Sequence, residues 1–140
     1  MNELRQASIR VTSQRETVLD ILKSSPIPLN INQIKEGFPE GFMDQSTLYR
    51  ILDLFVSKNL ITKTVLIDPM QSVYGYKHKQ HRHLLICINC QTINVISGCP
   101  LHGYEEQVAQ ESGYVIMDHQ LELYGLCPTC QQGASYESSK

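Results

Sequence analysis

The chain has 140 residues, a formal net charge of -2 and a hydrophobic content of 41%, enough for one domain or two small ones with modest cores. Its polar N-terminus does not resemble a secretory signal, and no apolar run approaches the roughly 20 residues that cross a membrane. Residues 1–79 carry ten Lys or Arg against eight Asp or Glu, whereas residues 80–140 carry two against six. We therefore expect a cytoplasmic protein without membrane association and with two chemically distinct halves.

The N-terminal half predicts helices followed by a hairpin. Residues 13–16 (SQRE) have the pattern of a capping box and open a first helix, which the segment 24–28 (SSPIP) ends. A short second helix is expected over residues 30–37. A third helix, capped by Asp44, carries apolar residues at helical spacing that form one core stripe: Leu48, Ile51, Leu52 and Phe55.

Two strands, residues 60–67 and 72–76, are predicted to pair around a turn at 68–71. Three helices and a two-stranded wing describe a winged helix-turn-helix, in which the last helix enters the major groove of DNA. We therefore expect the N-terminal half to be a DNA-binding domain.

The exposed face of the third helix has residue types that can read DNA. Arg50 can bond a guanine edge bidentately, and Tyr49 can contact a thymine methyl group or a phosphate. Arg10 and Arg15, near the start of the first helix, can supply phosphate or minor-groove contacts. The predicted DNA-binding residues are Arg10, Arg15, Ser46, Thr47, Tyr49 and Arg50. A surface helix with one polar face is common, so this pattern alone leaves a role without DNA open.

The C-terminal half predicts a small α+β domain over residues 80–130. Strands are expected over residues 81–88, 92–96 and 114–126. Between them we expect a helix that begins at Pro100, has an apolar stripe and ends at Gly113. The stripe consists of Leu101, Tyr104 and Val108. Residues 131–140 have no apolar content to bury and are expected to be a disordered tail.

Four of the five cysteines form two C-x-x-C pairs, Cys87 with Cys90 and Cys127 with Cys130. This spacing lets both thiolates of a pair reach one tetrahedral ion, and two pairs complete the ligand set of a structural zinc site. A disulfide or redox motif is the alternative, but two pairs in series in a reducing compartment favour zinc. A thiol–disulfide enzyme needs an accessible reactive thiolate, whereas ligand thiolates are consumed by the metal, so we expect no enzyme.

Four segments, in order along nearly the whole chain, resemble the ferric uptake regulator family of bacterial metal-responsive repressors. They are residues 11–15 (VTSQR), 46–50 (STLYR), 81–90 (HRHLLICINC) and 119–130 (HQLELYGLCPTC), of which the last two are specific. The resemblance implies a DNA-binding domain over residues 1–79 with a hinge at about 69–79, and a zinc-stapled dimerisation domain over 80–130. The protein would bind operator DNA as a homodimer. The segment SGCPL and the full cysteine set look closest to the zinc-uptake regulators of the family.

The resemblance also implies a second, regulatory metal site between the domains, formed by His81, His83, His102 and His119. His81 and His83 lie two positions apart on a predicted strand, so both rings project from the same face. Imidazole donors suit zinc, cobalt or nickel better than manganese. We therefore expect a second zinc or another divalent ion here, and repression of zinc-uptake genes when it binds.

The chain departs from the family at the usual sensing site near the hinge. Arg82 and Leu84 occupy the strand face that contributes to this site in relatives, and neither side chain can ligate a cation. Either the histidine site senses the metal, or a rebuilt site uses His78, Tyr76 or Cys99. An iron- or peroxide-responsive regulator of the same family is an alternative. A zinc-stabilised protein-interaction module without DNA binding is an alternative of another class.

Overall fold

A computed structural model describes residues 2–77 and 82–133 of the chain. The chain divides into two compact units, residues 1–79 and 80–140, and the fold is α+β, as the sequence predicts. Two histidines of the sequence analysis, His78 and His81, lie outside the described residues. Over the described ranges, every helix is too short or too polar to span a bilayer.

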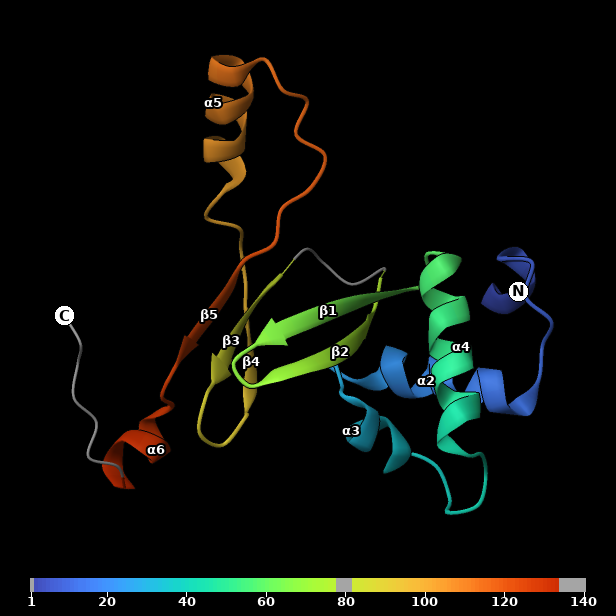
Figure 1. Cartoon of the computed structure of the whole chain (residues 1–140). Coiled ribbons are helices and arrows are strands. Elements are labelled where there is room, and N and C mark those ends of the chain that lie inside the picture. The colour runs from blue at the N-terminus through green and yellow to red at the C-terminus, as the bar shows by residue number, and fades with distance from the viewer. Residues whose placement is uncertain (1, 78–81, 134–140) are drawn as a thin grey trace. The chain divides into compact units, whose positions relative to one another are not determined.

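Over its described residues, the first unit contains four helices and a β-hairpin (Figure 1). The elements are α1 (Glu3–Gln6), α2 (Ser13–Ser24), α3 (Ile31–Lys35), α4 (Gln45–Ser57), β1 (Ile61–Ile67) and β2 (Met70–Tyr76). The two strands are antiparallel, with Ile61 opposite Tyr76. Helices α2 to α4 with the β1–β2 wing form the predicted winged helix-turn-helix, whereas α1 was not predicted.

Side-chain caps fix where the helices of the first unit begin. Asp44 caps α4 as predicted, and its carboxylate accepts from the backbone N–H of Thr47 at 2.8 Å. Helix α2 is capped by Thr12, which accepts from the N–H of Arg15, so the predicted cap at residue 13 was wrong by one position. Asn30 forms a capping box with Gln33 at the start of α3.

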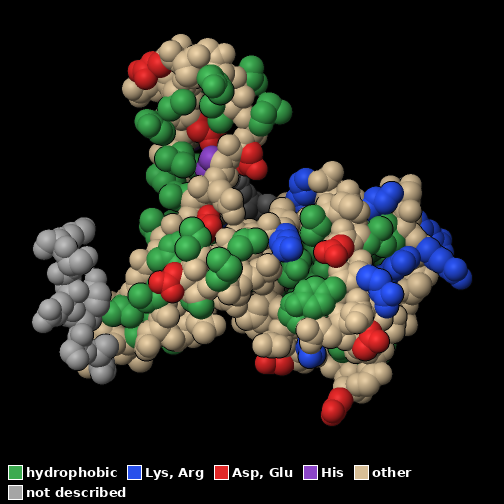
Figure 2. Space-filling view, in the orientation of Figure 1, with side chains coloured by type: hydrophobic (Ala, Val, Ile, Leu, Met, Phe, Trp, Pro, Cys, Tyr) green, Lys and Arg blue, Asp and Glu red, His purple; other side chains and the backbone are tan. Residues whose placement is uncertain are grey.

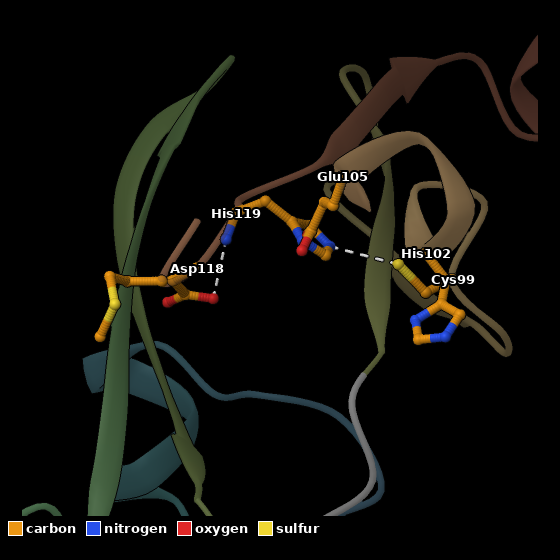
Figure 3. Close-up of a pocket in the computed structure, with 6 residues that line it drawn as sticks. Cys99, His102, Glu105, Asp118 and His119 are labelled. Carbon is orange, nitrogen blue, oxygen red and sulfur yellow. Dashed lines mark hydrogen bonds and ion pairs between the residues drawn. The ribbon is translucent and has the colours of Figure 1, made fainter. Parts of the chain in front are cut away.

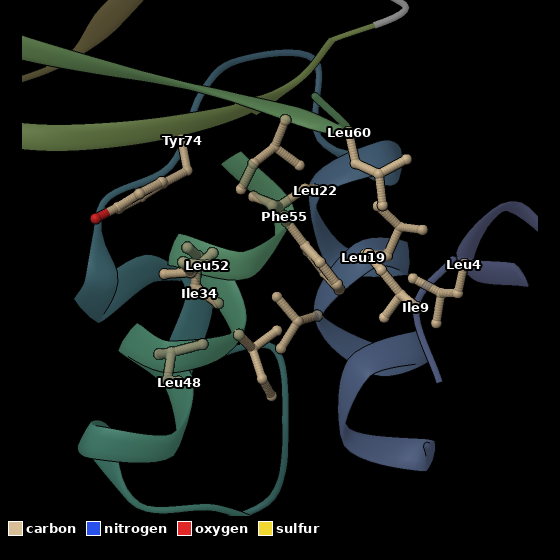
Figure 4. Packing of buried hydrophobic residues seen from close by; sticks show 13 residues of the cluster. Leu4, Ile9, Leu19, Leu22, Ile34, Leu48, Leu52, Phe55, Leu60 and Tyr74 are labelled. Atoms are coloured by element: carbon tan, nitrogen blue, oxygen red, sulfur yellow. The ribbon is translucent and has the colours of Figure 1, made fainter. Parts of the chain in front are cut away.

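The core of the first unit lies between α2, α4 and the hairpin (Figure 4). The four residues of the predicted α4 stripe are all buried, and they pack in one cluster with Val18, Leu19 and Leu22 of α2. Tyr74 of β2 is only 1% exposed and joins the same cluster. Because one face of α4 packs in this core, its opposite face is exposed and can contact another molecule.

The described part of the second unit contains a three-stranded sheet and two helices (Figure 1). Its elements are β3 (His83–Cys87), β4 (Ile93–Ile96), α5 (His102–Ser112), β5 (Glu122–Gly125) and α6 (Pro128–Gly133). The strand order is β4-β3-β5, with β3 antiparallel to β4 and parallel to β5. The start of β3 therefore lies beside the end of β4 and the start of β5.

Several elements of the second unit are shorter than the sequence suggested. Helix α5 begins at His102 rather than Pro100, although Gly113 ends it as predicted, with a left-handed φ of 77°. Strand β5 covers only residues 122–125 of the expected 114–126, because β3 offers it partners over four positions. Helix α6 includes residues 131–133, which the sequence analysis assigned to a disordered tail.

Candidate metal centres and nucleic-acid interface

The two C-x-x-C pairs meet at one end of the sheet of the second unit. Cys87 ends β3, Cys90 precedes β4, Cys127 follows β5, and Cys130 lies in α6. The four sulfur atoms lie within 4.8 Å of one another, and Sγ of Cys90 is 3.8 Å from Sγ of Cys127. A tetrahedral zinc with Zn–S bonds of about 2.3 Å holds its sulfurs about 3.8 Å apart. The residues present therefore fit a closed four-sulfur site.

The electrostatics of this cysteine cluster also call for a cation. Backbone N–H groups of Cys127 and Cys90 point at Sγ of Cys87 and lower the pKa of this thiol to about 6. The Asn89 amide lowers the pKa of Cys130, but neighbouring thiols and desolvation outweigh it and raise this pKa to about 11. The last proton thus stays on the cluster at neutral pH unless a positive ion offsets the thiolates.

A second cluster of ligand atoms forms at the opposite end of β3. Nε2 of His83 lies 3.3 Å from Sγ of Cys99 and 3.1 Å from Nε2 of His119, and Sγ of Cys99 lies 3.3 Å from the same His119 atom. His83 begins β3, Cys99 follows β4, and His119 precedes β5, so the sheet register brings them together. Four residue steps of β3 separate the two clusters, about 13 Å along the strand.

A hollow of about 590 Å³ opens beside this second cluster (Figure 3). Oε1 of Glu105, from α5, contacts Nδ1 of His119. His102 also lines the hollow, but its ring lies beyond Cys99 as seen from His119 and is outside the group of three converging atoms. Met117 and Asp118 complete the wall.

Two of the four predicted regulatory ligands, His83 and His119, are thus brought together. His81 lies outside the described residues, and His102 lines the hollow without joining the group. From the sequence, Cys99 is expected only as an alternative ligand of a rebuilt site near the hinge. The available signal was its place between a predicted strand and a predicted helix, which puts it at a sheet end. Tyr76, another alternative, bonds Glu3 in the first unit.

The exposed face of α4 carries the predicted recognition residues. Tyr49 is 41% exposed, and Arg50 is exposed and donates to the Thr47 hydroxyl at 3.4 Å. Ser46 is also exposed. Most of the Lys and Arg side chains visible in Figure 2 gather over the first unit. Tyr49 also borders a polar hollow that is lined by residues of α3 and of the wing as well as of α4.

The two arginines predicted near α2 differ in their surroundings. Arg10 is exposed, whereas Arg15 is half-buried and donates from Nη1 to the carbonyl oxygen of Arg10 at 2.8 Å. This bond anchors the loop that precedes α2. Arg15 keeps its remaining guanidinium donors for another acceptor.

The chain combines a winged helix with two clusters of side chains that could hold a metal ion, an arrangement that fits the class of metal-dependent transcription regulators. The chain belongs to the Ferric uptake regulator family, whose sequence profile matches residues 6–124. Members of this family are transcription regulators and not enzymes. The prediction from the sequence that the chain is not an enzyme is therefore confirmed.

Known relatives extend over most of the chain. The Ferric uptake regulation protein of Bordetella parapertussis is 27% identical over 135 residues, which cover 94% of this chain and 96% of that protein. The protein of the same name from Campylobacter jejuni is 29% identical over 132 residues, 91% of this chain and 83% of its own. Among solved structures, the Helicobacter pylori ferric uptake regulator superposes with a TM-score of 0.79 at 21% identity, over 99% of this chain and 89% of that one. A zinc-bound manganese uptake regulator gives 0.70 at 26% identity, over 88% and 94%.

Proposed function

We propose that the protein is a zinc-responsive repressor, which binds operator DNA as a homodimer when its second metal cluster is loaded. The observation that carries this proposal is the presence of two different ligand clusters at the two ends of β3. The four-thiol cluster fits a closed structural site, and the imidazole-containing cluster beside a hollow fits an ion that exchanges. A relative of this fold is known in a zinc-bound form.

The four-sulfur site would hold the second unit together. The buried residues in the described part of this unit are few: His83, Ile86, Cys87 and Ile93. So small a core supplies little folding free energy, and small domains of this kind need a metal or another cross-link. Structural zinc ligated by Cys87, Cys90, Cys127 and Cys130 supplies that link by joining β3, β5 and α6.

Exposed apolar side chains of the second unit support assembly with a second copy. Tyr104, Tyr114, Val115 and Met117 are 59%, 72%, 82% and 87% exposed. Within the described chain no residue of α5 is buried, and of the predicted stripe Tyr104 is exposed while Leu101 and Val108 are only half-buried. Association of two copies would cover these side chains and give the two-fold symmetry that paired operator half-sites require.

The residues of the first unit would read the operator. Asp44 fixes the start of α4, which holds Tyr49 and Arg50 on the exposed face, with Arg50 steadied by the Thr47 hydroxyl. Tyr49 and Arg50 would contact base edges, and Arg10 and Arg15 would contact phosphates. A bound ion would supply a cross-link between His83 and His119, and so favour the DNA-binding conformation over others.

Zinc-dependent binding to DNA tests this function. The protein holding one zinc per chain, in the cysteine site, is titrated onto DNA from upstream of its own gene with free zinc buffered at rising levels. Manganese and iron(II) are run in parallel. Specific binding that rises with zinc supports the proposal. Binding that responds to iron(II) alone would make it an iron-responsive regulator, and no DNA binding under any metal would leave an interaction module.

A further inference from the structure

We propose that Cys99 supplies a thiolate ligand to the regulatory ion, so that the second site is a cysteine–bis-histidine site that prefers zinc to manganese or iron(II). This inference deepens the proposed function and rests on it in one respect, namely that the second cluster takes a metal ion. It assigns to Cys99 the place that the family resemblance gave to His102.

The spacing of the three donor atoms fits one tetrahedral ion. With Zn–N bonds of about 2.0 Å and Zn–S bonds of about 2.3 Å, two nitrogens lie about 3.3 Å apart and a sulfur about 3.5 Å from each. The observed separations are 3.1 Å between His83 and His119, and 3.3 Å from Cys99 to each of them. The observed separations are shorter by about 0.2 Å, so small movements of the three side chains would accommodate a central ion. Three donors leave the fourth position of a tetrahedral ion open.

The path of the chain favours Cys99 over His102 as the third ligand. Gly98 has a left-handed φ of 79°, which turns the chain after β4 and returns Cys99 to the end of the sheet where His83 lies. His102 begins α5, and its ring lies on the far side of Cys99 from His119 (Figure 3). Among the described residues, Cys99 and not His102 therefore joins His83 and His119 in one group of converging donor atoms.

Glu105 sets the chemical form of His119 but does not bind the ion itself. Its carboxylate contacts Nδ1, so this nitrogen carries the proton and Nε2 keeps its lone pair toward Cys99 and His83. Glu105 is therefore a positioning residue. The donor set becomes one thiolate and two neutral imidazoles, and thiolate selects zinc over manganese, which prefers oxygen donors.

Cobalt(II) tests the ligand directly, because a cobalt–thiolate bond gives a charge-transfer band in the near ultraviolet that cobalt–imidazole bonds do not. Full-length protein with zinc retained in the four-cysteine site is titrated with cobalt(II), with wild type, Cys99→Ser and His102→Ala compared. We expect the band in wild type and His102→Ala, and its loss in Cys99→Ser. Zinc content of one per chain and an unchanged circular dichroism spectrum confirm that each variant is folded.

Two further measurements keep the inference falsifiable, the first of them in the unaltered chain. In the one-zinc protein, iodoacetamide should alkylate Cys99, and a second equivalent of zinc should slow that reaction at least about tenfold, as read by peptide mass spectrometry. Cys99→Ser should lower zinc affinity of the second site by more than about 100-fold, beyond the effect typical of an outer partner, while manganese affinity changes far less. A charge-transfer band in Cys99→Ser, or equal alkylation with and without the second zinc, would overturn the assignment. Neither result depends on DNA, so failure here is distinct from failure of zinc-dependent DNA binding.

Discussion

Glu105 contacts the ring nitrogen of His119 that faces away from the other donors, while the opposite nitrogen lies 3.1 Å from His83 and 3.3 Å from Cys99. The two residues come from α5 and from the segment before β5, so the contact joins the helix to the strand that enters the sheet. The contact therefore couples the position of α5 to the orientation of the His119 ring, which is a candidate metal ligand.

Removal of the Glu105 carboxylate should weaken the second site without removing a ligand. We expect Glu105→Ala to lower zinc affinity there about tenfold to 100-fold, the usual cost of losing an outer hydrogen-bond partner. Glu105→Gln should recover part of the loss, because its amide oxygen can still accept from Nδ1. The exposed neighbour Glu106 provides the matched control, Glu106→Ala. Competition with a zinc-binding dye measures all four proteins, and equal losses at Glu105 and Glu106 would mean a general charge effect.

Opening the four-cysteine site should unfold the second unit selectively. We expect Cys127→Ser, or a strong chelator, to remove a folding contribution on the order of 10 kcal/mol, since zinc binding free energy is folding free energy in small metal domains. The first unit has its own core and should stay folded. Amide resonances or limited proteolysis read the two units separately. Cys99→Ser serves as the matched control, and a Cys127→Ser protein with wild-type zinc content and melting behaviour would exclude a structural metal.

Substitutions on the exposed face of α4 should affect DNA binding alone. Tyr49→Ala and Arg50→Ala are each expected to lower affinity for a specific operator about tenfold to 100-fold, since a base contact contributes roughly 1–3 kcal/mol. Lys58→Ala, at the C-terminal cap of the same helix, removes a charge far from the recognition face and should have a smaller effect. Fluorescence anisotropy at one stated salt concentration measures the three variants. Wild-type affinity in both Tyr49→Ala and Arg50→Ala would place recognition elsewhere.

The N-terminal cap of α4 should give the first unit a defined acid dependence. The hydroxyl and N–H of Thr47 lower the pKa of Asp44 below its ordinary value of 3.8. Because the folded-state pKa is depressed, the contribution of this carboxylate is present above pH 3.8 and is lost as pH falls through the lower folded value. Asp44→Asn keeps a capping side chain that does not titrate.

We therefore expect wild type to exceed Asp44→Asn in urea midpoint at pH 7, and this difference to shrink below about pH 4. Helical circular dichroism of both proteins from pH 7 to pH 3 gives the comparison, in which acid effects on the cysteine site are common to both. A difference that does not change with pH would assign no role to the charge.

The sequence predicted those parts of the molecule that depend on local spacing. The stripe from Leu48 to Phe55 follows helical periodicity and is buried, and the two C-x-x-C pairs converge as their spacing predicts. Cys99 was not predicted as a partner of His83 and His119, because their proximity depends on the register of three strands rather than on a local motif. Residues 114–121 do not form the expected strand. A strand needs a neighbouring strand to pair with, and the apolar pattern of this segment does not show whether such a neighbour exists.

The central claim is that an ion at the second cluster controls DNA binding, and a comparison of His119→Ala with wild type tests it most directly. Both proteins, with zinc in the cysteine site, are titrated by fluorescence anisotropy onto an operator selected from random DNA by zinc-loaded wild type. Free zinc is fixed by a buffer, and His102→Ala is the control from the same hollow. The account predicts a loss of zinc-dependent affinity of about five- to 150-fold in His119→Ala, the usual range of allosteric coupling, and little change in His102→Ala. If His119→Ala binds the operator as tightly as wild type at the same free zinc, the sensor lies elsewhere in the chain.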